Sequence, residues 1–124
     1  MLITLPDILS ADDVATARRL LANAPWEDGA LSAGPQARTV KHNQQLPHGC
    51  DAATAIRQMV LAGLNRSALF FSAALPLRIF TPRINRYSGQ ANTYGNHIDN
   101  AIRLKALDGG GTEYVRTDVS CTVF

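Results

Sequence analysis

The hydrophobic pattern of this chain changes from helical spacing to strand alternation at about residue 75. Before that point apolar residues recur every three or four positions at 10–25 and at about 51–65, which predicts two amphipathic helices. Beyond it the apolar residues are β-branched or aromatic and alternate with polar ones, which is typical of strands. The pattern predicts an α+β protein, with a helical or mixed region at 1–74 and a β region at 75–124.

Local signals refine these elements. Ser10–Asp13 has the form of a capping box at the start of the first helix. Residues 2–5 predict a short strand, and residues 37–46 form a mixed segment that could be a strand. Asp108–Gly111 predicts a flexible turn between strands. In the β region, strand-like sequence is found at 77–79, 83–87 and 114–124.

The composition is that of a soluble globular protein of one domain or part of one. Of 124 residues, 46% are hydrophobic and 18% charged, so disorder is not indicated. The longest apolar stretch, Ala68–Leu77, is too short to cross a bilayer, and no signal peptide is visible at the N-terminus. Cys50 and Cys121 form no C-x-x-C motif. We therefore expect reduced thiols, no membrane partner and a cytoplasmic location.

Positive charge is concentrated in one segment. Between Arg78 and Lys105 there are five basic residues and one acidic residue, Asp99. Such a surround suits a small anionic substrate or cosubstrate, and would also suit a phosphate backbone. With only two lysines in the chain and no basic run, nucleic acid is the weaker interpretation.

His97 and Asp99 form a His-x-Asp pair. In an extended backbone, residues i and i+2 project from the same face, so the imidazole and the carboxylate could converge on one cation. Two histidines and one carboxylate on one face of an octahedral ion are the ligands of non-haem Fe(II) oxygenases, and the sequence offers two of these three. The alternative is a solvent-exposed loop histidine beside a turn aspartate.

The pair lies inside a longer pattern. In order, its members are Arg86-Tyr87, Gly89, Tyr94, His97 and Asp99-Asn100. This pattern resembles the signature of the prolyl-4-hydroxylase-like branch of Fe(II)/2-oxoglutarate-dependent dioxygenases. Over nearly its whole length the chain resembles the bacterial PKHD-type hydroxylases, some of which are associated with iron uptake. The segments that carry this similarity are Met1–Asp7, Asn43–Leu46, Ser72–Phe80, Asn85–Tyr87, Gly95–Arg103 and Arg116–Ser120.

The resemblance implies N-terminal helices packed on an incomplete double-stranded β-helix (a jelly roll), and it implies roles for several residues. His97 and Asp99 would be the first two iron ligands. Tyr87 matches the position whose hydroxyl often contacts 2-oxoglutarate, although it could equally be a core tyrosine on a strand. Tyr94 is expected to pack beside the site. Arg103 could face the site, but an ion pair on the surface or behind the site is the favoured interpretation.

The same resemblance implies Fe(II), 2-oxoglutarate as cosubstrate and ascorbate as reductant. The reaction would hydroxylate a small-molecule, peptide or protein substrate, with release of succinate and CO₂. No histidine follows Asp99, so the distal histidine and the basic clamp of the family cannot be placed. We interpret the chain as an N-terminal portion or a truncated member. The alternative is a catalytically silent metal-binding or oligomerisation module, with a homo-oligomer formed through an exposed strand edge.

Four other sites have structural interpretations. His42 and His48 are expected in solvent-exposed loops. Asn43–Gln45 could line a substrate mouth or be hydrogen-bonded within the fold. Trp26 is expected to be a core anchor.

Overall fold

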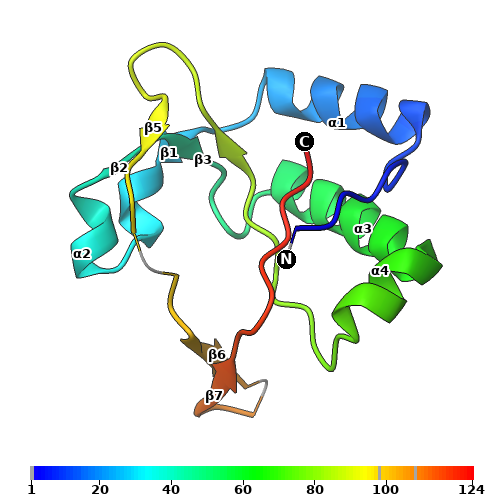
Figure 1. Cartoon of the computed structure of the whole chain (residues 1–124). Helices are drawn as coiled ribbons and strands as arrows, with labels where there is room; N and C mark the ends of the chain where they lie inside the picture. Colours follow the sequence, from blue (N-terminus) through cyan, green and yellow to red (C-terminus); the bar gives the residue numbers. More distant parts are fainter. Residues whose placement is uncertain (1, 98, 108) are drawn as a thin grey trace.

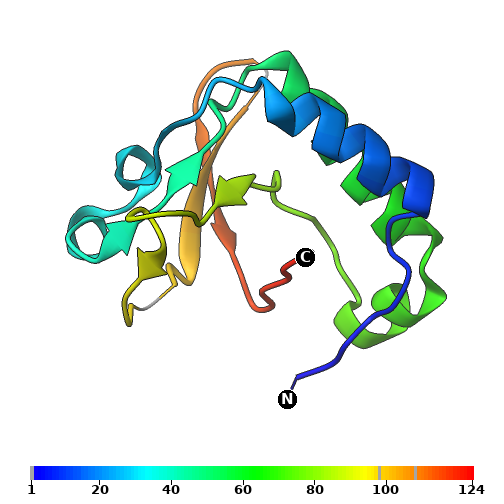
Figure 2. The same cartoon turned by 90° about the horizontal axis from the view of Figure 1, so that it is seen from above.

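The structure, a computed structural model, describes residues 2–97, 99–107 and 109–124. Helices α1, α3 and α4 lie on one side of the molecule, and the short strands β1 to β5 lie on the other (Figure 1). Figure 2, seen from above, shows α1 and α3 side by side. The elements are α1 (Ala11–Ala22), β1 (Glu27–Asp28), the 3-10 helix η1 (Gly29–Ser32), α2 (Pro35–Arg38), β2 (Lys41–His42), β3 (Gln44–Gln45), α3 (Asp51–Arg66), α4 (Ala68–Ala74), β4 (Asn85–Arg86), β5 (Thr93–Tyr94), β6 (Ile102–Ala106) and β7 (Thr112–Arg116).

Helix α1 begins at the predicted capping box. The Asp13 backbone N–H donates to Ser10 Oγ at 3.1 Å, and the Ser10 backbone N–H donates to Asp13 Oδ2 at 3.0 Å. The two bonds satisfy donors that a helix start otherwise leaves unpaired. The hydrogen bonds from Ser10 lower the pKa of Asp13. The predicted first helix is confirmed, and it ends at Ala22, before Pro25.

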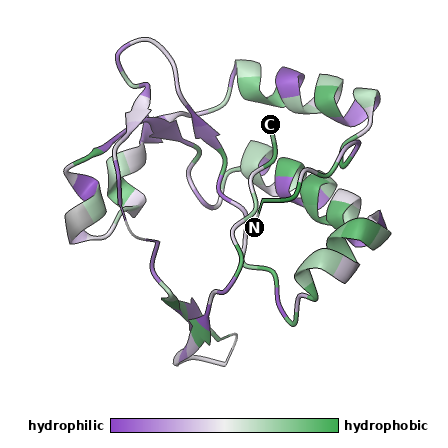
Figure 3. Ribbon diagram, viewed as in Figure 1, coloured by the Kyte–Doolittle hydropathy of each residue, from purple (hydrophilic) through white to green (hydrophobic). Residues whose placement is uncertain are grey.

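The hydrophobic core is centred on α3, which packs against α1 and α4. In Figure 3, α3 and α4 are mostly hydrophobic, whereas β1 and β3 are hydrophilic. The predicted second helix is confirmed over Asp51–Arg66. Its buried face presents apolar side chains at helical spacing, and these meet the side chains of neighbouring elements. The buried hydrophobic residues are Leu46, Ala53, Ile56, Leu64 and Phe70.

Arg57 joins α3 to the strand side of the molecule. Its side chain is 7% exposed. Nε donates to the Pro82 carbonyl at 2.8 Å, and Nη1 donates to the His48 carbonyl. Burial is the main cause that lowers the pKa of this guanidinium. Arg57 thereby holds the segments before α3 and before β4 against one helix.

Among the described residues the strands form three small antiparallel sheets. One sheet has the order β1–β3–β4, and the other two are the pairs β2–β5 and β6–β7. The register pairs Gln45 with Glu27 and with Asn85, and pairs Lys41 with Tyr94. These sheets with their helices confirm the α+β class. They do not form a closed double sheet over the described residues, so the jelly roll stays a prediction.

Several sequence expectations for strands are wrong. No strand forms at 2–5, 77–79 or 117–124, and the 37–46 segment is divided between α2, β2 and β3. Alternation of polar and apolar residues does not by itself make a strand, because the backbone N–H and C=O groups of a strand need a partner strand to bond with. A helix forms these hydrogen bonds within itself. Helix α4 was not predicted. Its N-terminus is capped by Ser67 Oγ, which accepts from the Phe70 N–H at 3.1 Å. Its last residue is followed by Leu75, whose φ of 42° is left-handed.

Strands β6 and β7 form a hairpin around the glycine run, where a turn was expected; β6 has no counterpart among the predicted strands. Asp108 lies outside the described residues. Gly110 and Gly111 have φ of 86° and 90°, a region that favours glycine. The hairpin lies at the edge of the molecule, away from the helices (Figure 1), and every β6 side chain is exposed.

Candidate metal centre

The backbone around His97 is held by β2. After β5 the Gly95 N–H donates to the Val40 carbonyl at 2.8 Å. A Cβ at Gly95 would lie 3.0 Å from the Val40 side chain, so glycine permits this close approach. The Gly95 carbonyl in turn lies 2.7 Å from His97 Nδ1. Because a carbonyl oxygen only accepts, Nδ1 carries a proton and Nε2 is the free ring nitrogen.

His97 and Asp99 face each other. His97 Nε2 lies 3.4 Å from Asp99 Oδ1. With Nδ1 protonated, a neutral imidazole presents a lone pair at Nε2, so two acceptors confront one another. A proton on Nε2 relieves that repulsion as an ion pair, and so does a shared cation. One divalent ion with donor distances of about 2.1 Å can reach both atoms at this separation, so the pair is a candidate for two ligands of one ion.

The pair is open to solvent on the carboxylate side. The side chain of Asp99 is 65% exposed and that of His97 is 23% exposed. Within the described residues, no group of three or more His, Cys, Asp or Glu side chains is placed to hold a metal. His42 and His48 are exposed, as expected, and join no such group, but His42 lies in strand β2 and not in a loop. The described residues therefore bring together two candidate ligands, His97 and Asp99.

Tyr94 covers the imidazole, as the sequence led us to expect. The two rings are stacked, with centroids 3.6 Å apart and planes 14° apart. Burial is the main cause that raises the pKa of Tyr94, and the carboxylate of Asp99 and the ionised form of Tyr87 raise it further. Arg103 acts in the opposite direction.

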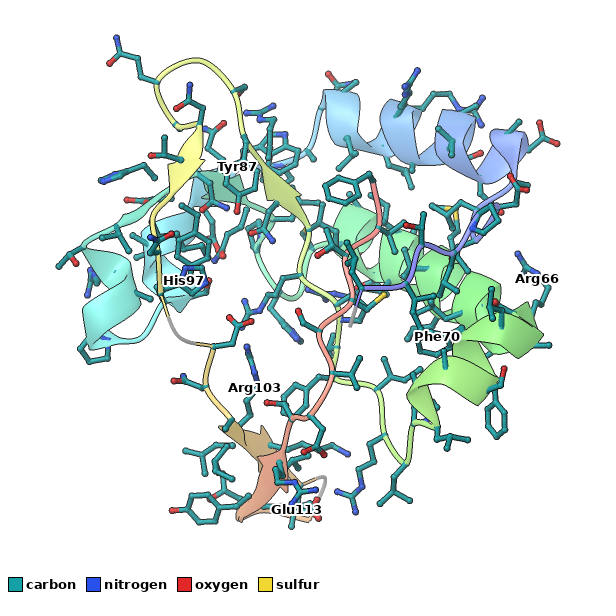
Figure 4. All side chains as sticks on the ribbon, in the orientation of Figure 1. Arg66, Phe70, Tyr87, His97, Arg103 and Glu113 are labelled. Carbon is teal, nitrogen blue, oxygen red and sulfur yellow. The ribbon has the colours of Figure 1, made fainter. Side chains whose placement is uncertain are left out.

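Tyr87 follows β4 and is 48% exposed. In Figure 4, Tyr87 and His97 lie on the strand side of the molecule, away from Phe70 and Arg66 on the helical side. The half-exposed ring does not belong to the hydrophobic core. Contact of its hydroxyl with a cosubstrate stays a prediction.

Arg103 lies at the base of the site on β6. Its guanidinium carbon is 5.8 Å from the Phe80 ring centroid. Arg78, between α4 and β4, pairs with Glu113 of β7, and Arg116 at the end of β7 pairs with Asp118. The charge of Arg103 therefore acts beside Tyr94, whereas Arg78 is partly neutralised. A cavity of about 270 Å³ between 78–81 and the hairpin is lined by neither His97 nor Asp99.

Lys41 is a site residue that sequence reasoning missed. It is only 8% exposed, and its Nζ lies 5.5 Å from the centroid of the Tyr94 ring. Nζ donates to Ser32 Oγ at 2.9 Å and to Gln45 Oε1 at 3.4 Å. Burial is the main cause that lowers the pKa of Lys41. The signal in the sequence was polar alternation, because Lys41, Asn43 and Gln45 share the buried face.

The Asn43–Gln45 run is hydrogen-bonded within the fold, which is one of its two sequence interpretations. Asn43 Nδ2 donates to Asn85 Oδ1 at 3.2 Å, and Gln45 Nε2 to Glu27 Oε1 at 3.3 Å. Gln44 Oε1 accepts from Arg86 Nε and Nη2 at 3.0 and 2.6 Å.

Trp26 is half-buried, and its ring contacts Arg86, which bonds to Gln44, so it supports the Asn43–Gln45 run more than it anchors the core. The guanidinium of Arg86 lies 4.2 Å from its ring centroid, and its Nε1 donates to the Leu21 carbonyl at 3.3 Å. The strand region beside the site is thus held mainly by polar contacts.

Known proteins match the chain over its full length, although no family model matches it. It is 67% identical to a PKHD-type hydroxylase of Polaromonas sp. (strain JS666 / ATCC BAA-500), 54% to one of Verminephrobacter eiseniae (strain EF01-2) and 53% to one of Azoarcus sp. (strain BH72). Each match covers 100% of this chain and 53% of the relative. The chain thus spans about half the length of the curated relatives it matches. By this similarity over all 124 residues, the chain belongs to the PKHD-type hydroxylase family.

Proposed function

We propose that His97 and Asp99 hold Fe(II) in a 2-oxoglutarate-dependent dioxygenase that hydroxylates its substrate. The observation that carries this proposal is the 3.4 Å approach of His97 Nε2 to Asp99 Oδ1, with Nδ1 engaged by the Gly95 carbonyl. The relatives are named hydroxylases, which supports the same reaction class.

Each described residue has a task in this proposal. The Gly95 carbonyl fixes the imidazole tautomer, so that His97 presents Nε2 to the ion. Asp99 supplies an anionic ligand from the open side. Tyr87 donates its hydroxyl to a carboxylate of 2-oxoglutarate. Iron with this cosubstrate supplies oxidative decarboxylation, which releases succinate and CO₂ and is coupled to hydroxylation.

The complete reaction needs groups beyond these. The described residues bring two ligands together, and the relatives are about twice as long as this chain. We therefore assign a third ligand and the clamp for the far carboxylate of 2-oxoglutarate to the additional length of the family. The 124-residue chain itself is expected to bind Fe(II) weakly and to turn over little.

The surroundings of the pair suit an anionic group. Arg103 acts near Tyr94, and Lys41 is buried beside the same ring. The substrate class that we propose is a small molecule, peptide or protein, with a link to iron uptake as in some family members. Ascorbate would keep the iron reduced. We propose a cytoplasmic location. Among the described residues, no helix has the length and apolar character needed to span a bilayer.

Succinate formation tests this proposal. The protein from the complete reading frame, incubated with Fe(II), 2-oxoglutarate and ascorbate, should form succinate slowly even without substrate. His97→Ala and Asp99→Ala should each abolish it, while His42→Ala, at an exposed histidine, should not. Succinate formation that survives both ligand substitutions would contradict the proposal. Mass spectrometry of candidate substrates under the same conditions would identify the hydroxylated class.

A second function, from a different class, is favoured by the β6–β7 hairpin. Each strand pairs only with the other within the described part of the chain, so both outer edges are unpaired. Exposed edges invite another chain, as in a silent metal-binding or oligomerisation module. A reading frame that continues past Phe124 with a histidine and then an arginine favours the enzyme. A frame without them favours the module.

A further inference from the structure

A continuous row of side chains leads from the β2–β3 segment to the candidate metal pair. Gln45 and Ser32 hold Lys41 Nζ by hydrogen bonds, and Lys41 lies over the Tyr94 ring. Tyr94 then stacks on His97. The links are hydrogen bonds to Lys41, a cation–π interaction between Lys41 and Tyr94, and ring stacking between Tyr94 and His97.

The Gly95 carbonyl alone does not fix the direction of Nε2. A hydrogen bond at Nδ1 holds one point of the imidazole and leaves its plane free to tilt about that point. A flat ring at 3.6 Å with a 14° interplanar angle restricts the tilt. Together the two contacts fix where Nε2 points, which an aliphatic side chain at position 94 would do less well.

Lys41 holds the Tyr94 ring in turn. Lys41 and Tyr94 are directly paired residues of β2 and β5, so their side chains project from one face. A cation near an aromatic face is attracted to its π electrons, and most strongly where water is excluded. Lys41 is 8% exposed and is fixed by two further acceptors.

We propose that Tyr94, held by Lys41, is a positioning residue that orients the His97 imidazole for metal binding. This inference rests on the proposed function, because it assumes that His97 Nε2 is a ligand. The flat ring is what matters, so Tyr94→Phe should preserve the effect and Tyr94→Leu should lose it.

The test uses the purified 124-residue chain with Mn(II) as the probe, followed by NMR. In the wild type and Tyr94→Phe, ring currents should shift the His97 ring protons upfield, and in Tyr94→Leu this shift should vanish. The Mn(II) affinity, from paramagnetic broadening of the same resonances, should fall roughly tenfold in Tyr94→Leu and stay within about twofold in Tyr94→Phe. Lys41→Met keeps the Tyr94 side chain but removes the cation that holds its ring, and it should weaken binding about threefold. Lys105→Met, at an exposed β6 lysine, is its matched control.

Two results are decisive against these ideas and differ from each other. If Tyr94→Leu and Lys41→Met bind Mn(II) as the wild type does, with the amide resonances of α3 unchanged, while His97→Ala loses binding, the positioning role is overturned and the proposed function stands. If His97→Ala itself binds Mn(II) unchanged, the proposed function fails and the positioning role fails with it.

Discussion

His97 Nε2 and Asp99 Oδ1 lie 3.4 Å apart, while His97 Nδ1 is engaged by the Gly95 carbonyl. A neutral imidazole held in this way has no proton to offer the carboxylate. A proton on Nε2 or a shared cation would relieve the repulsion between the two acceptors, and the proposed function places a divalent ion there. The predictions that follow concern the fold that carries this pair and the ion itself.

The cap of α1 should respond to acid. The pKa of Asp13 is lowered in the folded chain by its hydrogen bonds with Ser10. The contribution of Asp13 to stability is therefore present above its ordinary pKa of 3.8, and it is lost as the pH falls through the lower pKa of the folded chain. Far-ultraviolet circular dichroism during acid titration should show the helices weakening in this range. Asp13→Asn should flatten the response, and an unchanged acid profile in that variant would count against the cap.

Gly63 should not tolerate alanine, although alanine favours helices. A Cβ at this position of α3 would lie 2.1 Å from the Ile8 carbonyl oxygen, a backbone atom that cannot rotate away. Overpacking of this kind outweighs the helix-propensity gain, so the free energy of unfolding should fall by about 1–2 kcal/mol. Denaturant unfolding measures it. Gly49→Ala is the control, since nothing lies within 4 Å of its new Cβ, and equal effects at both positions would refute the contact.

Arg57 should be far more costly to replace than Arg66 on the same helix. Arg57→Met keeps the volume but leaves the Pro82 and His48 carbonyls without their donor, which should lower the free energy of unfolding by about 3 kcal/mol. Arg66 is exposed and points outward in Figure 4. Arg66→Met should change the free energy of unfolding by less than about 0.5 kcal/mol. Equal losses in the two variants would show that the Arg57 hydrogen bonds do not hold the β4 segment.

The β6–β7 hairpin should associate with other chains. Leu104 and Tyr114 are 59% and 76% exposed, and the outer edges of their two strands are unpaired within the described residues, so sedimentation should show association that increases with protein concentration. Leu104→Lys adds charge to the edge and should reduce it. Leu31→Lys, at an exposed leucine of η1, is the control. A chain that stays monomeric at all concentrations would exclude this hairpin as a contact surface.

Sequence was a good guide where the determining contacts are local. The Ser10 cap, the apolar spacing of α3 and the glycines between β6 and β7 each act within a few residues, and all are found where predicted. The His97-x-Asp99 spacing is local in the same sense, and the structure brings its two side chains together.

Sequence was a poor guide where a partner from far along the chain decides the outcome. Residues 2–5 and 117–124 alternate but have no strand to pair with among the described residues. Lys41 gained its place beside Tyr94 only through the β2–β5 register, across a long intervening segment. A buried lysine in a polar run is a weak signal until that register is known.

The most direct measurement is an anomalous difference map, recorded at the iron edge, from a crystal of this chain soaked with Fe(II) without oxygen. The account predicts a peak between His97 Nε2 and Asp99 Oδ1, and its loss in His97→Ala crystals treated in the same way. A map with no peak there, or with those two groups turned away from each other, would contradict the assignment of the pair as an iron site.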